Sequence, residues 1–375
     1  MESLTICLDC NKYLDYSHFQ LFFRTIWKKT NFRHSSGEER DSDTIRRLKI
    51  KLSLLCKWFF VSFVSLICQI CQCEHGKDLN LDVSGVDVYF YDFPRNDVES
   101  FTIDAAADGI LKIPQLDKTK KFIIFVPGYK SNINKKTEEL VRDTFRNFPN
   151  SYLIILDHSP YTNDNQGYVK SYERSVKYVY YIGKALADFL ADLARGGISP
   201  KNIHCIGHSL GAQMLGQTGQ LFFEKTGTKI AKITGLDPAG PCFSNSFTQD
   251  QIRSGVADYV DVYHCNAGGL GTTSVLADTD FFVNRKGQSQ PNCGTPLIPG
   301  IFDSSKAAKC SHRACIELYT ATVSNPNWFL AWRCDEYKQF KKGECSTNEV
   351  TIAGFWNPGN ATGVFYFSTD GYNLD

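Results

Sequence analysis

A serine between two glycines, in Gly207-His208-Ser209-Leu210-Gly211, has the clearest potential for chemistry in this 375-residue sequence. The short stretch 203–206 before it predicts a strand, and residues 211–225 predict a helix. Between a strand and a helix, Gly-x-Ser-x-Gly forms a sharp turn that lifts the serine hydroxyl above a sheet. The pattern therefore predicts Ser209 as a nucleophile for acyl transfer.

A serine hydroxyl is a weak nucleophile, so it needs a base, and the base needs an orienting acid. On this kind of turn the three follow in the order serine, acid, histidine. Asp237 is the favoured acid, because it follows a predicted strand over 230–236 and begins the turn Asp-Pro-Ala-Gly-Pro. Asp258 and Asp261 lie beside or within another predicted strand, which suits a surface or structural role better.

Two histidines follow Asp237 in the chain, and either could be the base. His264 ends a predicted strand over 259–263, where it could simply pack or anchor a loop. His312 lies in Cys310-Ser311-His312-Arg313, expected to be a loop tethered by a cysteine before a helix-like stretch. Position alone favours His312 and leaves His264 as the alternative.

The oxyanion of an acyl-transfer intermediate needs hydrogen-bond donors. One is usually the backbone N–H after the nucleophile, which here belongs to Leu210. The other comes from the loop after an early strand, here Pro127-Gly128-Tyr129. We therefore predict the N–H groups of Leu210 and Tyr129 as the two donors.

Strand-like and helix-like stretches alternate along the chain, which predicts an α/β fold with a mostly parallel sheet flanked by helices. After Cys265 the sequence is rich in Gly, Pro and Ser, and we expect loops over one end of the sheet. The expected strands cover 86–91, 122–126, 152–156, 203–206, 230–236 and 259–263, and the expected helices cover 136–148, 172–195 and 211–225.

Composition narrows the class of protein. Lys and Arg number 41 against 40 Asp and Glu, so there is no basic footprint for nucleic acid. The 14 cysteines favour an oxidised, extracellular domain, because the later ones do not make a zinc-binding pattern.

We predict three segments: an irregular leader over 1–45, a signal peptide or signal-anchor segment over 46–73, and a catalytic domain over 74–375.

The middle segment carries the prediction of localisation. Basic residues precede an apolar run over 58–67, which has the form of a signal peptide. The run is short for a membrane span, which needs about 20 residues. We expect cleavage after Cys73 and a secreted, extracellular chain, with anchoring at the membrane as the alternative.

Together these residues resemble the pancreatic-type lipase family, in particular its single-domain insect members, over roughly residues 85–370. The resemblance implies an α/β-hydrolase fold and a triad of Ser209, Asp237 and His312, and it chooses His312 over His264. It also implies oxyanion-hole roles for Tyr129 and Leu210. The matching stretches are 207–212, 235–241, 259–264, 280–284 and 310–313.

Some positions depart from the family pattern. The family usually has His-Gly before the oxyanion residue, where this chain has Pro127-Gly128. Arg253 and Val256 occupy positions where calcium-binding members carry acids, so no metal and no cofactor is expected. The family's second, β-sandwich domain is not expected, because the chain ends at Asp375.

The resemblance also implies disulfides and a cover over the site. The expected pairs are Cys242–Cys265, Cys293–Cys310 and Cys334–Cys345, with Cys205 and Cys315 left over. The family's lid corresponds to residues 294–309, which is short, and the loop from Cys265 to Thr279 also looks trimmed. In this family short covers accompany phospholipases that cleave the sn-1 ester. Asn360-Ala361-Thr362 is a glycosylation sequon.

These observations predict a secreted serine hydrolase of lipid esters, of the lipase or phospholipase A1 type, acting through a covalent acyl-enzyme at a lipid–water interface. No obligate protein partner is expected. The alternatives are a triacylglycerol lipase, a non-catalytic lipid-binding relative similar to insect yolk proteins, and a general esterase or peptidase on the same fold.

Overall fold

The structure is a computed structural model that describes residues 75–164, 168–244, 247–294 and 305–370. The predicted leader over 1–45 and the predicted signal segment over 46–73 lie outside the described residues. No helix in the described ranges is both long and apolar enough to cross a membrane.

Strands within the described residues form one sheet in the order β10-β9-β11-β8-β7-β6-β5-β3-β4-β1-β2. Its middle, from β4 to β11, is parallel, and antiparallel strands extend both edges. The strands are β1 (Asp87–Asp92), β2 (Asp97–Thr102), β3 (Lys121–Val126), β4 (Ser151–Asp157), β5 (Ile203–His208), β6 (Lys232–Leu236), β7 (Tyr259–His264), β8 (Thr279–Val283), β9 (Phe329–Arg333), β10 (Val350–Ala353) and β11 (Gly363–Phe367).

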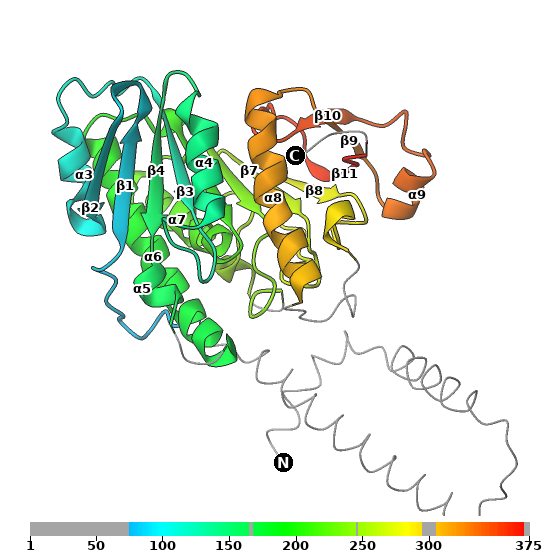
Figure 1. The fold of residues 1–375 in the computed structure, drawn as a ribbon, viewed down its shortest axis with the longest axis horizontal. Helices are drawn as coiled ribbons and strands as arrows, with labels where there is room; N and C mark the ends of the chain where they lie inside the picture. The colour runs from blue at the N-terminus through cyan, green and yellow to red at the C-terminus, as the bar shows by residue number, and fades with distance from the viewer. Residues whose placement is uncertain (1–74, 165–167, 245–246, 295–304, 371–375) are drawn as a thin grey trace, which may run out of the picture. The chain divides into compact units, whose positions relative to one another are not determined.

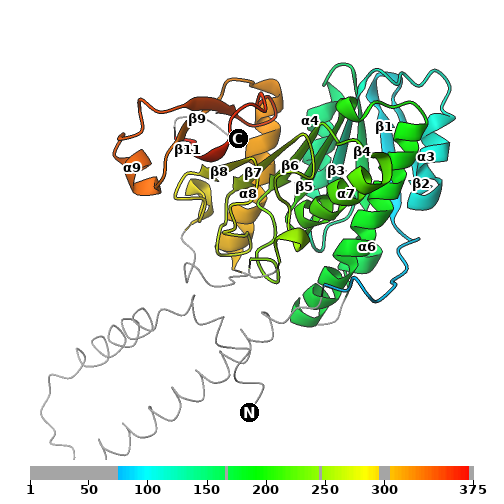
Figure 2. The ribbon, with the colours of Figure 1, turned by 180° about the vertical axis from the view of Figure 1, so that it is seen from behind.

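Helices cover both faces of this sheet. Figure 1 shows α4 and α8 in front of it, and Figure 2 shows α3, α6 and α7 on the opposite face. The predicted α/β-hydrolase fold with a mostly parallel sheet is confirmed. The α-helices are α3 (Ile103–Leu111), α4 (Lys136–Arg146), α5 (Ser159–Thr162), α6 (Tyr168–Arg195), α7 (Leu210–Thr226), α8 (Lys306–Ser324) and α9 (Tyr337–Lys341).

The strands β3 and β4 are largely apolar because helices cover both faces of the sheet. In β3, every residue from Phe122 to Val126 is buried, and β4 is buried from Ser151 to Leu156. A parallel strand covered on both sides needs such a continuous apolar run rather than alternation. The same property made these strands visible in the sequence.

The prediction of loops after Cys265 is wrong. Strands β8, β9, β10 and β11 follow it and extend the sheet, with β11 pairing in parallel with β8. Every residue of β8 is buried, and Phe365 and Phe367 of β11 enter the core. Gly, Pro and Ser are frequent in the connections between these short strands, and they concealed the strands in the sequence.

One of the expected disulfides is also wrong. Cys265 pairs with Cys315 rather than with Cys242, which forms a different disulfide. Cys265 follows β7 directly, where the helix α8 crosses, so the Cα atoms of Cys265 and Cys315 come within 5.7 Å. The structure also pairs Cys293 with Cys310 and Cys334 with Cys345, and it leaves Cys205 as a buried free thiol.

Peptide mapping of the unreduced protein tests this pairing. We expect a linked peptide containing Cys265 and Cys315, and a Cys242–Cys265 link would contradict the structure.

Replacing Cys315 by Ala should lower the free energy of unfolding by about 2–4 kcal/mol, because the bridge closes a long loop in the unfolded chain. Chemical denaturation of both proteins measures the difference.

Candidate active site

Ser209 stands on a strained turn between β5 and α7. Its φ is +55° and its ψ is −118°, a conformation that non-glycine residues rarely adopt. A Cβ at Gly207 would lie 2.7 Å from the Ala212 Cα, and one at Gly211 would collide with the Val126 carbonyl oxygen. The Ser209 N–H donates to the Leu236 carbonyl at 3.0 Å, which fixes the turn to the end of β6.

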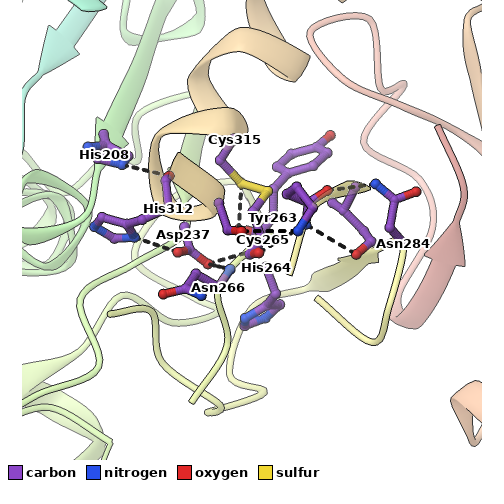
Figure 3. The surroundings of a disulfide bond; sticks show 12 residues. His208, Asp237, Tyr263, His264, Cys265, Asn266, Asn284, His312 and Cys315 are labelled. Atoms are coloured by element: carbon purple, nitrogen blue, oxygen red, sulfur yellow. Dashed lines mark hydrogen bonds and ion pairs between the residues drawn. A yellow bond between two sulfur atoms is a disulfide. The ribbon is translucent and has the colours of Figure 1, made fainter. Parts of the chain in front are cut away.

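Asp237 follows β6 and is completely buried. Its Oδ1 accepts hydrogen bonds from the backbone N–H groups of Cys265, at 2.7 Å, and Asn266, at 2.9 Å. Its Oδ2 lies 2.5 Å from Nδ1 of His312, as Figure 3 shows. A buried carboxylate is costly unless it is paired and hydrogen-bonded, and these three contacts meet that requirement. They also hold the carboxylate in one orientation.

Gly271 completes the surroundings of this carboxylate. A Cβ at Gly271 would collide with both carboxylate oxygens of Asp237, so only glycine fits there. The loop between β7 and β8 carries this glycine and is hydrogen-bonded to the turn after Asp237. The Gly240 N–H donates to the Leu270 carbonyl, and the Thr272 N–H donates to the Pro238 carbonyl.

His312 lies within α8, and the prediction that it occupies a loop before a helix is wrong. The helix begins earlier, at Lys306, because the Ser305 side chain caps it by accepting from the Ala308 N–H. Since a carboxylate only accepts hydrogen bonds, Nδ1 of His312 carries the proton toward Asp237. This leaves Nε2 as the nitrogen that can take a proton when the imidazole is neutral.

His264, the alternative base, is enclosed. Its Nε2 lies 2.8 Å from Asp280 Oδ1, its Nδ1 lies 3.2 Å from the Thr272 carbonyl oxygen, and its ring stacks on Phe282. The side chain is fully buried, so both nitrogens are committed to the interior. The structure brings His312, and not His264, to Asp237.

The rival acids are also engaged elsewhere. Asp261 is buried in β7, where it pairs with Lys232 at 2.9 Å and accepts from the Thr234 hydroxyl. Asp258 lies at the surface and pairs with Lys201. Among the described residues, no hydrogen bond or ion pair joins either carboxylate to a histidine.

Two contacts bring the nucleophile turn next to the acid–histidine pair. The Ala239 N–H, two residues after Asp237, donates to the Ser209 carbonyl at 3.1 Å. His208, the residue before the serine, lies 3.1 Å through Nε2 from the His312 carbonyl oxygen, and the two rings are 4.6 Å apart. Among the residues described, no hydrogen bond joins the Ser209 hydroxyl to the His312 imidazole; such bonds often tighten only when substrate binds.

The turn after β3 passes directly against the serine. A Cβ at Gly128 would lie 2.9 Å from Ser209 Cβ, so the backbone of residues 127–129 borders the nucleophile. Leu210 is the first residue of α7, and an N–H at that position has no carbonyl partner within its own helix. Both predicted donor residues, Tyr129 and Leu210, thus belong to segments next to Ser209.

The surroundings of His208, which is partly exposed, keep its imidazole neutral. Burial, and then the charge of the adjacent His312, lowers the pKa of His208 well below its ordinary value. A neutral His208 facing a carbonyl must donate through Nε2, so it fixes the His312 backbone without adding charge. His204, on the same strand, also has a pKa lowered well below the ordinary value, mainly by burial.

The expected cover is described only at its base. Residues 295–304 of the predicted 294–309 cover lie outside the described residues, and the Cys293–Cys310 disulfide joins its two ends. Across the described ranges, no group of three His, Cys, Asp or Glu side chains is placed to hold a metal ion.

The model of a protein family described as Lipase matches residues 67–352. Lipase member H of Rattus norvegicus is 36% identical over 160 residues, covering 43% of this chain and 34% of the relative. Phospholipase A1 member A of Homo sapiens is 35% identical over 174 residues, covering 46% and 36%. Pancreatic lipase-related protein 2 of Bos taurus is 28% identical over 251 residues, covering 62% and 50%.

The chain therefore spans half or less of the length of these relatives. Among solved structures, esterase PE8 aligns with a TM-score of 0.26 and 18% identity, over 38% of this chain and 67% of that one.

The histidines whose pKa values are lowered predict a loss of stability in mild acid. An unfolded histidine takes up a proton as the pH falls below about 6.5, whereas His204 and His208 have lowered pKa values and stay neutral when folded. The free energy of unfolding is therefore unaffected by protonation of these two groups above pH 6.5. Below pH 6.5 it falls by about 1.4 kcal/mol per pH unit for each group. Urea unfolding between pH 7.5 and 5.5 measures this slope, and it should be shallower in His204→Gln. An identical slope in that variant would contradict the assignment.

Proposed function

The chain belongs to the lipase family, and on this premise we propose that it hydrolyses the carboxylic esters of lipids through a triad of Ser209, Asp237 and His312. The observation that carries the proposal is the 2.5 Å contact between Asp237 Oδ2 and His312 Nδ1, beside a serine held on a strained turn. The alternative acids, Asp258 and Asp261, and the alternative base, His264, interact with other residues.

The reaction begins when the Ser209 hydroxyl attacks the ester carbonyl and His312 Nε2 takes its proton. The carbonyl oxygen becomes an oxyanion, for which the N–H groups of Leu210 and Tyr129 are the proposed donors. Collapse of this intermediate breaks the ester bond, and the departing alcohol takes the proton from His312. Water then attacks the acyl-serine by the same steps in reverse and releases the fatty acid.

Asp237 keeps its charge throughout these steps. Its carboxylate holds the tautomer of His312 that leaves Nε2 free, and it stabilises the imidazolium when the proton arrives. The two backbone N–H groups on Oδ1 prevent the carboxylate from turning away.

We further propose that the protein works outside the cell, at a lipid–water interface. Three disulfides within the described residues suit an oxidising compartment. Asn360 is exposed in the connection between β10 and β11, so the predicted sequon is accessible to glycosylation.

Phospholipids cleaved at the sn-1 ester are the proposed substrates. The shortness of the predicted cover in the sequence supports this choice, as does the similarity to a protein named phospholipase A1 member A. Triacylglycerol is the second candidate, which the similarity to a pancreatic lipase-related protein favours.

The triad predicts large losses of turnover on single substitutions. Ser209→Ala and Asp237→Asn should each lower kcat for a short soluble ester by at least about a thousandfold. Asp261→Asn is the matched control, since Asp261 is equally buried but lies away from the site. It should lower stability and keep kcat. Wild-type turnover of no ester would refute the proposal, and equal turnover by Ser209→Ala would refute the nucleophile.

Substrate choice is tested with the wild-type protein on vesicles of phosphatidylcholine and on emulsified triglyceride. We expect faster release of fatty acid from phospholipid, and from its sn-1 position, because a short cover leaves room for a headgroup. Faster hydrolysis of triglyceride would instead establish the second candidate.

A further inference from the structure

His158 is a buried histidine outside the triad, and it contacts the turn that borders Ser209. It follows β4 at the carboxyl edge of the sheet and is almost completely inaccessible to solvent. Its Nε2 lies 3.0 Å from the carbonyl oxygen of Pro127, and its Nδ1 lies 2.8 Å from the hydroxyl oxygen of Thr162.

The partners of His158 define its tautomer. A carbonyl oxygen only accepts, so Nε2 carries the hydrogen and donates it to Pro127. Burial lowers the pKa of His158, so the ring is neutral and Nδ1 accepts from the Thr162 hydroxyl. A neutral ring with both nitrogens satisfied is a stable arrangement in the interior.

Thr162 holds the other end of the same turn. Its backbone carbonyl accepts a hydrogen bond from the Lys130 N–H at 3.1 Å. The turn 127–130 is thus fixed at its first carbonyl by His158 and at its last N–H by the carbonyl of Thr162. The hydrogen bond between the His158 and Thr162 side chains connects the two residues that hold the turn.

Fixing these ends matters because Gly128 lies between them. Glycine is required there, since a Cβ would press on Ser209, and glycine leaves the backbone free to rotate. The peptide plane before Gly128 contains the Pro127 carbonyl, which His158 holds. The plane after it contains both the Tyr129 N–H and the Gly128 carbonyl, which accepts from the Ser131 N–H at 3.2 Å.

We propose that His158 is a positioning residue of the oxyanion hole: with Thr162 it holds the 127–130 turn so that the Tyr129 N–H stays aimed at the developing oxyanion. This inference rests on the proposed function.

Kinetics of His158→Ala and His158→Gln test the proposal. Removing one oxyanion donor costs about 100- to 1,000-fold in kcat, so a misaimed donor should cost about 10- to 100-fold. We expect that loss in His158→Ala, with little change in KM and a similar loss of affinity for a boronic acid that forms a tetrahedral adduct with the serine. His158→Gln should recover part of kcat, because its amide can donate to Pro127.

His204→Ala is the matched control. His204 is also buried, and its Nε2 lies 2.9 Å from Thr234 Oγ1, but it lies at the start of β5, at the opposite end of that strand from the nucleophile turn. This variant should lose stability and keep kcat. Equal loss of kcat in both alanine variants, or unchanged kcat in His158→Ala, would overturn the positioning role. If His158→Ala does not fold, Thr162→Val removes the hydroxyl partner and should show a smaller loss of the same kind.

Backbone amide exchange measured by NMR separates this inference from the proposed function. The Lys130 and Ser131 amides should exchange faster in His158→Ala than in wild type or His204→Ala, whatever the activity. Unchanged exchange would overturn the inference, whereas a wild type that hydrolyses no ester would overturn the proposed function.

Discussion

The buried carboxylate of Asp237 is the constraint on which the site depends. A charge with no exposure to water is tolerated only when its lone pairs are occupied, and leaving it unpaired would cost several kcal/mol. Two backbone N–H groups after β7 and one imidazole from α8 occupy them. The carboxylate therefore sets where the end of β7 and the second turn of α8 must lie.

The Cys265–Cys315 disulfide reinforces the same junction. Cys265 donates its N–H to Asp237, and its sulfur is bonded to a helix residue three positions after His312, about one turn away. Figure 3 shows the disulfide and the Asp237–His312 contact side by side. One residue thus supports the acid through its backbone and the base-bearing helix through its side chain.

How far the sequence could predict this arrangement depended on the range of the interactions. The strands β3 and β4 were visible because each contains a continuous apolar run, and the Ser209 turn was visible because its glycines are a local requirement. The strand β11 was missed because β8, with which it pairs in parallel, lies 84 residues away, and the start of α8 was missed because a single capping serine sets it. The correct partner of Cys265 follows from where α8 crosses the sheet, which no spacing in the sequence encodes.

His158 was missed too. Its place directly after a central strand, at the edge of the sheet where ligands bind in such folds, was a usable signal.

The most direct test of the central claim is covalent labelling with a fluorophosphonate, which reacts with an activated serine, followed by mass spectrometry of the peptides. The account predicts one adduct, on Ser209, that forms far more slowly when Asp237 is replaced by Asn. An adduct on another residue, or equal rates in the two proteins, would contradict it.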